Sequence, residues 1–370
     1  MNFDFSEDVE AMRVAVRGLL ADRFPRGAVR RQVDAGQGFD RDFLRSLGEM
    51  GWLGVAIPEA FGGSAMGYEP LCMIAEELGA SLAPVPVAST LYLGAEALLS
   101  FGSEEQKRAL LPRVVAGDLV IAAAVAEGSG DPAEAALATL FVDGRVTGKK
   151  LPVIDGDIAD MFVVVVRLEG GESSLVLVEA GADHISRTTL DTLDLVRGAV
   201  RLTLDGAVAE PLPGARGWQA VAHWLDRAAA LLAFEQVGGA QAALDMATAF
   251  ARERYAFGRA IGSFQAIKHK LADVYVATEL ARSNAFYGAW ALDTDADDLA
   301  IAAAAARVAA TDAFSLAARE NIQTHGGMGF TWESDCHLYY RRARELALMV
   351  GGPRYWRRRL VSQLDMAAGG

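Results

Sequence analysis

Arg254, Phe257, Gly258 and Gln265 stand close together in the segment Arg254 to Asp273, RYAFGRAIGSFQAIKHKLAD. The arginine ends one helical pattern, the Phe-Gly pair forms a turn, and the glutamine opens the next helical pattern. A guanidinium group binds phosphate with two parallel hydrogen bonds, and a helix N-terminus favours an anion. The spacing therefore indicates a site for a phosphate-bearing ligand. A helix turn with a surface arginine gives the same spacing, so the residues alone leave both interpretations open.

A second glycine-rich stretch, QTHGGMGFTWESD, runs from Gln323 to Asp335 and ends a long alanine-rich helical pattern. Gly326, Gly327 and Gly329 leave this backbone almost without side chains. A glycine pair of this kind ends a helix, because glycine adopts left-handed conformations readily. Glycine also lets a ligand approach backbone amides closely, and the two uses are compatible.

Other catalytic motifs are missing from the sequence. Cys72 and Cys336 do not stand at metal-ligand spacing, and so small a number of cysteines indicates a reducing compartment. Neither a GxGxxG dinucleotide motif nor a P-loop is present, so a Rossmann or phosphoryl-transfer enzyme has no support. The histidines are scattered without a cysteine or carboxylate partner at nucleophile or metal spacing: His184, His223, His269, His325 and His337.

Composition limits the class of protein. The net charge of −13 argues against a general nucleic-acid binder, which needs a basic face. There is no uncharged apolar run of about 18 residues that could span a bilayer. The acidic start, MNFDFSEDVE, resembles neither a secretory signal nor a transit peptide. We therefore expect a cytoplasmic protein with no membrane span.

The elements that must position these motifs fall into three regions of the 370-residue chain. Apolar residues recur at three and four positions over 1–119, which predicts an all-helical N-terminal domain; Ser103 with Gln106 is typical of a helix start. Over 120–213, short apolar runs are separated by Asp-Gly and Gly-Gly pairs, which are typical of hairpin turns. This pattern predicts a small antiparallel β domain. Long alanine-rich helical patterns over 214–370 predict a closely packed antiparallel helical bundle.

The pattern RxxFGxxIxxFQxxxxxLAD, together with QTHGGMGF, resembles the acyl-CoA dehydrogenase family. Members of this family are flavoproteins with an N-terminal helical domain, a middle β domain and a C-terminal four-helix bundle. The resemblance extends over nearly the whole chain, through GWLGVAIPEAFGGSAMGYEPLCMIAEELG (Gly51 to Gly79), FGSEEQKRALLPRVVAGDLVIAAAVAE (Phe101 to Glu127) and YYRRAR (Tyr339 to Arg344).

This resemblance implies FAD as cofactor, an acyl-CoA substrate and an electron-transfer flavoprotein as electron acceptor. Arg254 is expected to contact the FAD pyrophosphate, with Phe257 packed beside it and Gln265 as a further cofactor contact. The loop of Gln323, Gly326 and Gly327 is expected to lie against the ADP part of an FAD held mainly by the neighbouring subunit. The resemblance therefore implies a homo- or hetero-oligomer, either a dimer or a tetramer.

Two segments depart from the family pattern where it lines the flavin ring. A Leu-Thr-Glu-Pro-type segment reads Val125-Ala126-Glu127-Gly128 here, and a Trp-Ile-Thr-type segment reads Pro152-Val153-Ile154. Ala126 and Ile154 replace residues with hydroxyl groups, and Pro152 replaces an aromatic plate. Two hydrogen bonds and one stacking surface are missing.

The catalytic base of the family is missing as well. The glutamate that removes the substrate α-proton has two known positions, which fall on Val350 and on Ala228, and neither side chain accepts a proton. Asp226 would face roughly 200° away from Ala228 on a helix, and Glu235 would lie roughly 10 Å along it. We interpret both as structural carboxylates, and the catalytic residue stays unassigned.

Two functions are compatible with this sequence. One is an acyl-CoA dehydrogenase that oxidises the α,β-bond of a CoA thioester with FAD as hydride acceptor. The other is a non-catalytic partner subunit that completes the FAD site of a paralogous acyl-CoA dehydrogenase. A nucleic-acid-binding member of the fold is disfavoured by the acidic charge. The FAD content of the chain distinguishes the first two.

Overall fold

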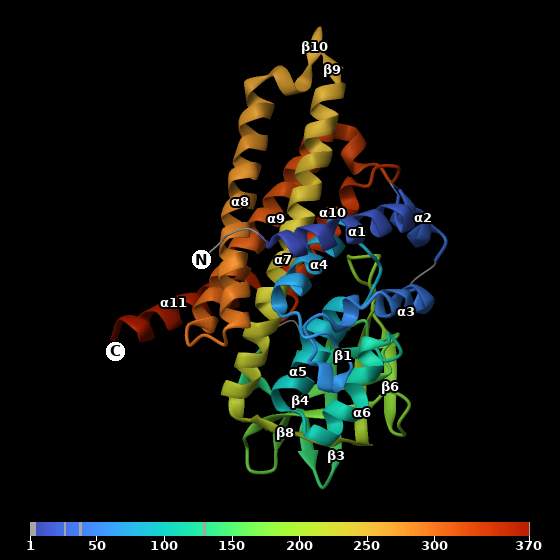
Figure 1. Ribbon diagram of the computed structural model, residues 1–370, viewed down its shortest axis with the longest axis vertical. Coiled ribbons are helices and arrows are strands. Elements are labelled where there is room, and N and C mark those ends of the chain that lie inside the picture. The colour runs from blue at the N-terminus through green and yellow to red at the C-terminus, as the bar shows by residue number, and fades with distance from the viewer. Residues whose placement is uncertain (1–4, 26, 37–38, 129–130, 370) are drawn as a thin grey trace.

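The computed structural model describes residues 1–370 except 1–4, 26, 37–38, 129–130 and 370 (Figure 1). Part of the acidic N-terminal stretch therefore lies outside the described residues. The first region is helical, as predicted. Its helices are α1 (Glu7–Arg23), α2 (Ala28–Asp34), α3 (Arg41–Glu49), α4 (Tyr68–Ser81), α5 (Glu96–Phe101) and α6 (Glu104–Val115), with short η1 (Trp52–Gly54) and η2 (Glu59–Phe61) and a π-helical η3 (Ala88–Ala95).

Helix α6 begins at the predicted position. The Gln106 amide donates to the Ser103 hydroxyl at 3.1 Å, and the Ser103 amide donates to the Gln106 side chain at 3.0 Å. This reciprocal pair is a capping box, which satisfies two amides that a helix start leaves without partners.

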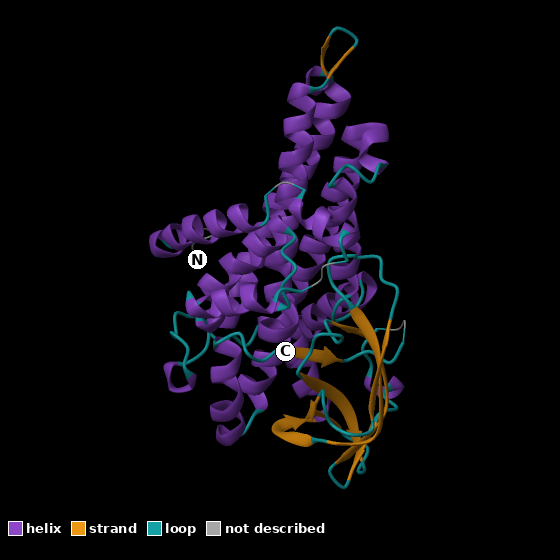
Figure 2. Cartoon of the chain, turned by 90° about the vertical axis from the view of Figure 1, so that its right-hand side faces the viewer, coloured by secondary structure: helices purple, strands orange, loops and turns teal. Residues whose placement is uncertain are grey.

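The middle region forms an eight-stranded sheet with the path β6-β7-β3-β2-β4-β5-β8, and β1 pairs with β4 in parallel. Figure 2 shows these strands gathered below and beside the helices. The predicted Asp-Gly turn joins β2 to β3, with positive φ at both Asp143 and Gly144. The strands are β1 (Ile121–Ala124), β2 (Leu140–Val142), β3 (Arg145–Ile154), β4 (Met161–Leu168), β5 (Ser173–Glu179), β6 (Ile185–Thr189), β7 (Ala199–Val208) and β8 (Glu210–Arg216).

Strand β4 connects two apolar cores. Val163 and Val165 belong to the large core shared with the helices, whereas Val164 and Val166 pack inside the β domain. Because both faces are buried, the strand reads as a continuous apolar run rather than as an alternation.

The third region is helical and completes the α–β–α order, so the predicted fold class is confirmed. Figure 1 shows α7, α8 and α9 as the long axis of the molecule. The elements are α7 (Gly217–Glu253), β9 (Tyr255–Ala256), β10 (Arg259–Ala260), η5 (Ile261–Ser263), α8 (Gln265–Asp293), α9 (Leu299–His325), η6 (Gly326–Phe330), α10 (Cys336–Leu348) and α11 (Pro353–Gly369).

By length and composition alone, one described segment, 299–330, could cross a membrane. This segment is α9 with η6, and α9 packs against α7, α8, α10 and α11. Of its apolar window, 56% is buried inside the molecule. Alanine supplies much of its apolar character and also lets neighbouring helices approach, so the segment is interpreted as the core helix of the bundle.

Helices α4 and α7 touch through their backbones at two glycines. A Cβ atom on Gly238 would lie 1.8 Å from the carbonyl oxygen of Glu76, and one on Gly79 would lie 2.0 Å from the carbonyl oxygen of Glu235. No side chain fits at either position unless the helices separate. This contact fixes the N-terminal helices against the bundle.

We expect Gly238→Ala to lower the free energy of unfolding by about 1–3 kcal/mol, because the methyl group overpacks the contact between α4 and α7. Gly18→Ala is the matched control, since Gly18 is helical and a Cβ there meets no atom within 4 Å. The control should be neutral or stabilising by up to about 1 kcal/mol. Urea unfolding at one protein concentration measures both, and equal midpoints for Gly238→Ala and the parent protein would refute the close contact.

Candidate functional site

The arginine motif forms one tip of the molecule. Arg254 caps the C-terminus of α7, and Gln265 is the first residue of α8. Between them β9 and β10 pair as a hairpin, with Phe257 and Gly258 at positive φ in its turn. Figure 1 shows this hairpin beyond the end of the long helices.

The side chains that the motif contributes to this tip face solvent. The Phe257 side chain is 95% exposed, and Arg254 and Gln265 are exposed as well. Among the described residues, the Arg254 guanidinium has neither a side-chain hydrogen bond nor an ion pair within the chain. The neighbouring Arg259, in contrast, lies over the Phe264 ring at 4.0 Å. The tip therefore presents a guanidinium and an aromatic ring to solvent, where a second molecule can reach them.

The glycine loop is equally open. Gln323 is exposed in the last turn of α9, and η6 starts at Gly326. Gly326 has φ +60° and so needs glycine for its backbone conformation. Gly327 has no such need, and a Cβ there would meet no atom within 4 Å. The protein's own packing therefore does not demand glycine at this position.

The structure brings the arginine motif and the glycine loop to the same end of the bundle. The His325 ring at the end of α9 stacks on the Phe250 ring of α7 at 4.1 Å, one helical turn before Arg254. Lys270 of α8 also pairs with Glu320 of α9 at 3.1 Å. The His325 side chain is buried, and its Nδ1 lies 2.9 Å from the Asn321 carbonyl oxygen.

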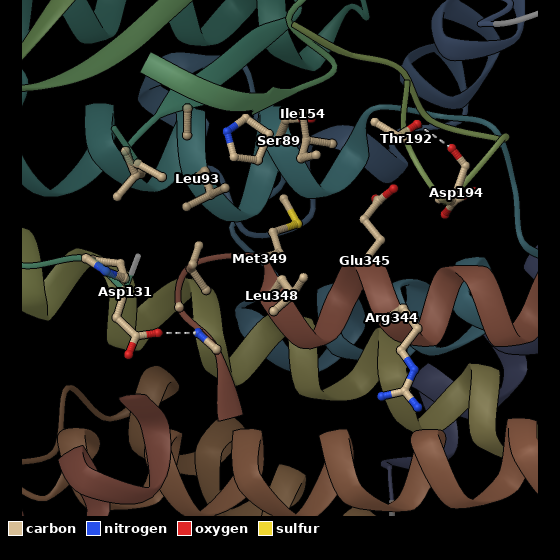
Figure 3. Close-up of a pocket in the computed structure, with 18 of the residues that line it drawn as sticks. Ser89, Leu93, Asp131, Ile154, Thr192, Asp194, Arg344, Glu345, Leu348 and Met349 are labelled. Atoms are coloured by element: carbon tan, nitrogen blue, oxygen red, sulfur yellow. Dashed lines mark hydrogen bonds between the residues drawn. The ribbon is translucent and has the colours of Figure 1, made fainter. Parts of the chain in front are cut away.

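A cavity of about 360 Å³ lies between the β domain and α10 (Figure 3). Its walls are largely apolar, and Figure 3 shows the side chains of η3, β3 and α10 that line it. The apolar lining includes Leu93, Val125, Ile154, Leu348 and Met349, and the polar lining consists of Ser89, Asp131, Thr192, Asp194, Arg344 and Glu345.

Most of the residues that depart from the family pattern line this cavity. Ala126, Pro152, Ile154 and Val350 all line it, although they come from separate segments. Their side chains offer no hydroxyl, amide or aromatic group. Val350 also has φ +57°, which is unfavourable for a β-branched residue. Ala228, the other predicted base position, is fully buried and is not part of the cavity wall.

A buried lysine supports this wall from behind. Lys150 Nζ donates to Glu127 Oε1 at 2.7 Å and to the Val125 carbonyl oxygen at 3.3 Å. Burial lowers the pKa of Lys150 to about 8, although the Glu127 carboxylate opposes this effect. The ion pair holds the segment around Ala126 in place without adding a polar group to the cavity.

Beside the cavity lies a buried cluster of charges that sequence reasoning missed. Arg197 pairs with Glu235 at 2.6 Å, and Arg342 pairs with Asp194 and, at 3.4 Å, with Glu235. These residues come from the loop before β7, from α7 and from α10. Because these residues lie far apart in the chain, no local sequence pattern indicates that they meet.

Glu345 stands at the edge of this cluster and in the cavity wall. Its side chain is 8% exposed, and its nearest cation is Arg197 Nη1, 3.8 Å from its Oε1. Burial raises the pKa of Glu345 well above its usual range; the Asp194 carboxylate adds to this, and Arg342 and Arg197 oppose it. Burial thus favours the neutral form of this carboxyl group, whereas the two arginines favour its charged form.

The two carboxylates considered in the sequence are structural, as interpreted. Glu235 is enclosed by the two arginines, and Asp226 is buried beside Arg359 of α11. Burial raises the pKa of Asp226 to about 6, against the effect of Arg359. Arg357, Arg358 and Arg359 each form an ion pair; the first two are largely exposed, whereas Arg359 is only 17% exposed.

Comparisons with known proteins agree with this architecture. Residues 6–118 match the family described as acyl-CoA dehydrogenase, N-terminal domain, and residues 215–363 match acyl-CoA dehydrogenase, C-terminal domain. Acyl-CoA dehydrogenase IpdE2 of Mycolicibacterium smegmatis is 33% identical over 361 residues, which cover 97% of this chain and 99% of that protein.

Two solved structures are similar over their whole length. A variant of the Tcur3481-Tcur3483 steroid ACAD has a TM-score of 0.89 at 31% identity, covering 98% of this chain and 99% of that chain. The ChsE4-ChsE5 complex from Mycobacterium tuberculosis has a TM-score of 0.89 at 28% identity, covering 99% of each. With two family domains in order and a relative 33% identical over nearly its full length, this chain belongs to the acyl-CoA dehydrogenase family.

Proposed function

We propose that this chain is the partner subunit of a heteromeric acyl-CoA dehydrogenase. It lends Arg254, Gln265 and the glycine loop to an FAD whose ring and catalytic base belong to a paralogous chain. One contrast carries the proposal. The motif residues at the end of the bundle are present and exposed, whereas the cavity expected to hold the flavin ring has Ala126, Pro152 and Ile154 in place of the family's hydroxyl and aromatic groups.

The nucleotide-facing end fits FAD, which members of the family bind. The Arg254 guanidinium is exposed and available for two parallel hydrogen bonds to a pyrophosphate. Gly327 leaves room for a nucleotide against the backbone. Gln265 offers a side-chain amide at the N-terminus of α8, where the helix dipole favours a phosphate.

The cavity does not fit the flavin ring. Ala126, Pro152 and Ile154 supply neither a donor nor a stacking surface to its wall. The wall also carries the Arg344 guanidinium and the carboxyl groups of Asp131, Asp194 and Glu345. FAD supplies hydride acceptance in this family, and we assign no step of that chemistry to this cavity.

Relatives support a heteromeric assembly. ChsE4 and ChsE5 form a complex, and each chain of such a pair can contribute a different part of a shared site. By analogy, we propose that acyl-CoA and an electron-transfer flavoprotein act at the paralogous subunit of the present assembly. The proposed place of action is the cytoplasm.

The alternative is a self-sufficient acyl-CoA dehydrogenase. The cavity itself, of about 360 Å³, and the presence of Glu345 in its wall favour this alternative. It requires one FAD for each chain, whereas the partner role requires about one FAD for each pair of unlike chains. Flavin stoichiometry therefore separates the two functions.

We expect the chain purified alone to bind little FAD and to oxidise acyl-CoA negligibly. Val350 and Ala228 cannot act as the general base, and general-base catalysis typically contributes about 10²–10⁴-fold to the rate. Co-expression with paralogues from the same genome should give a yellow, active complex. Flavin absorbance and a dye-linked assay with acyl-CoAs of several lengths measure both. Stoichiometric flavin with rapid turnover by the lone chain would overturn the partner role.

In that complex, Arg254→Lys should weaken FAD retention about tenfold, since a point charge cannot replace a guanidinium fork. Flavin release on dialysis measures this effect. Arg252→Lys is the matched control, because Arg252 is exposed in the last turn of α7 and has no assigned contact with FAD. Equal flavin loss from the two variants would argue against a pyrophosphate contact at Arg254.

A further inference from the structure

Two aromatic rings join the helix ends that carry the arginine motif and the glycine loop. The His325 ring, in the last turn of α9, stacks on the Phe250 ring of α7 with 4.1 Å between the ring centroids and 25° between the ring planes. Arg254 follows Phe250 by four residues, about one helical turn, and Gly326 follows His325 directly. The stack therefore lies immediately behind both motifs.

The stack also supports the backbone of the glycine loop. The His325 side chain is buried in the last turn of α9, with its Nδ1 beside the Asn321 carbonyl oxygen. A Cβ atom on Gly329 would lie 3.2 Å from the Cβ of His325 and 2.6 Å from the Ile322 carbonyl oxygen. Gly329 therefore lets η6 fold back against this turn, and the position of the loop depends on where the turn lies.

Two other described contacts join the helix ends here, and both are weaker. The Asn321 side-chain amide donates to the Met246 sulfur of α7 at 3.3 Å, and a thioether is a weak acceptor. Lys270 of α8 pairs with Glu320 of α9, but the lysine is 48% exposed, and exposed ion pairs contribute little. A cavity of about 340 Å³ has both rings of the stack in its wall, so packing from that side is incomplete.

We propose that His325 is a positioning residue for the ADP part of FAD. Through its stack on Phe250, it sets where the Arg254 guanidinium stands relative to the backbone of the glycine loop, so that both reach one nucleotide. This inference rests on the proposed function, since it requires the two motifs to bind the same FAD. The His325 ring acts from behind the motifs and does not itself contact the cofactor.

Stacked rings suit this role because their geometry is specific. An aromatic side chain has only two χ angles, and ring pairs prefer particular distances and angles. The pair therefore fixes the orientation of the two helix ends as well as their separation. Two parallel hydrogen bonds from a guanidinium to a pyrophosphate need this alignment. A shift of α7 against α9 thus lowers affinity without removing any side chain that contacts the ligand.

The first test compares FAD retention by the complex of this chain with a paralogue. His325→Ala removes the ring and should weaken retention about three- to tenfold, the range to which the energy of an aromatic pair converts. His325→Phe keeps a ring against Phe250 and should retain most of the affinity. His223→Ala is the matched control, because His223 is a half-buried histidine near the other end of α7. Flavin release on dialysis measures all three variants.

The second test asks whether His325 acts through Arg254. In an Arg254→Lys background, His325→Ala should weaken FAD retention by less than about twofold further, because alignment matters little once the guanidinium fork is gone. A histidine that only stabilises the fold would give additive losses.

The third test needs no flavin. Hydrogen exchange of the chain alone reports the local opening of the glycine loop. The amides of 326–330 should exchange at least about threefold faster in His325→Ala than in the parent chain or in His325→Phe. Thermal unfolding shows whether each variant is folded. If His325→Ala is not, Phe250→Leu, which removes the other ring of the stack, takes its place.

Three results would overturn the inference. They are equal FAD retention by His325→Ala and the parent complex, additive losses in the double variant, and a loss in His325→Phe as large as that in His325→Ala. Unchanged FAD retention by Arg254→Lys would instead refute the proposed function at that residue. The exchange measurement would then still decide whether the stack holds the glycine loop.

Discussion

Two buried guanidinium groups hold the parts of this molecule together. Arg197 comes from the loop of the β domain before β7, Arg342 from α10, and both meet Glu235 on α7. Buried ion pairs add little net stability against an apolar core, yet removing one partner leaves an uncompensated charge and is strongly destabilising. The positions of the β domain, α7 and α10 are therefore coupled, and the cavity exists where they meet.

The tip of the bundle and the cavity differ in what they present. At the tip, Arg254 is exposed and a Cβ on Gly327 would meet no atom within 4 Å. In the cavity wall, Ala126, Pro152 and Ile154 stand where the family pattern has hydroxyl and aromatic groups, and the Lys150–Glu127 ion pair stabilises the segment behind Ala126. A partner subunit can lose the side chains that contact the flavin ring. It must keep its fold, because this fold still has to match that of the catalytic chain.

Glu345 lies where the charge cluster meets the cavity wall. The Arg197 guanidinium pairs with Glu235 at 2.6 Å and lies 3.8 Å from Glu345, so one cation faces two buried carboxyl groups. Burial raises the pKa of Glu345 well above its usual range, and Arg342 and Arg197 oppose this effect. The cluster that couples the domains therefore also sets the charge at one edge of the cavity.

The sequence by itself determined the order of helices and strands, because local patterns carry it: the Ser103–Gln106 cap, the Asp143-Gly144 turn and the helix boundaries at Arg254 and Gln265 all follow from near neighbours. Through a resemblance that spans the chain, it also predicted which motif residues contact FAD. Only the tertiary structure decided that Ala126, Ile154 and Val350 share one cavity and that Glu345 stands in its wall beside Arg197. Such juxtapositions depend on packing between segments far apart in the chain, and the pKa of a buried carboxyl group depends on neighbours that no local pattern reveals.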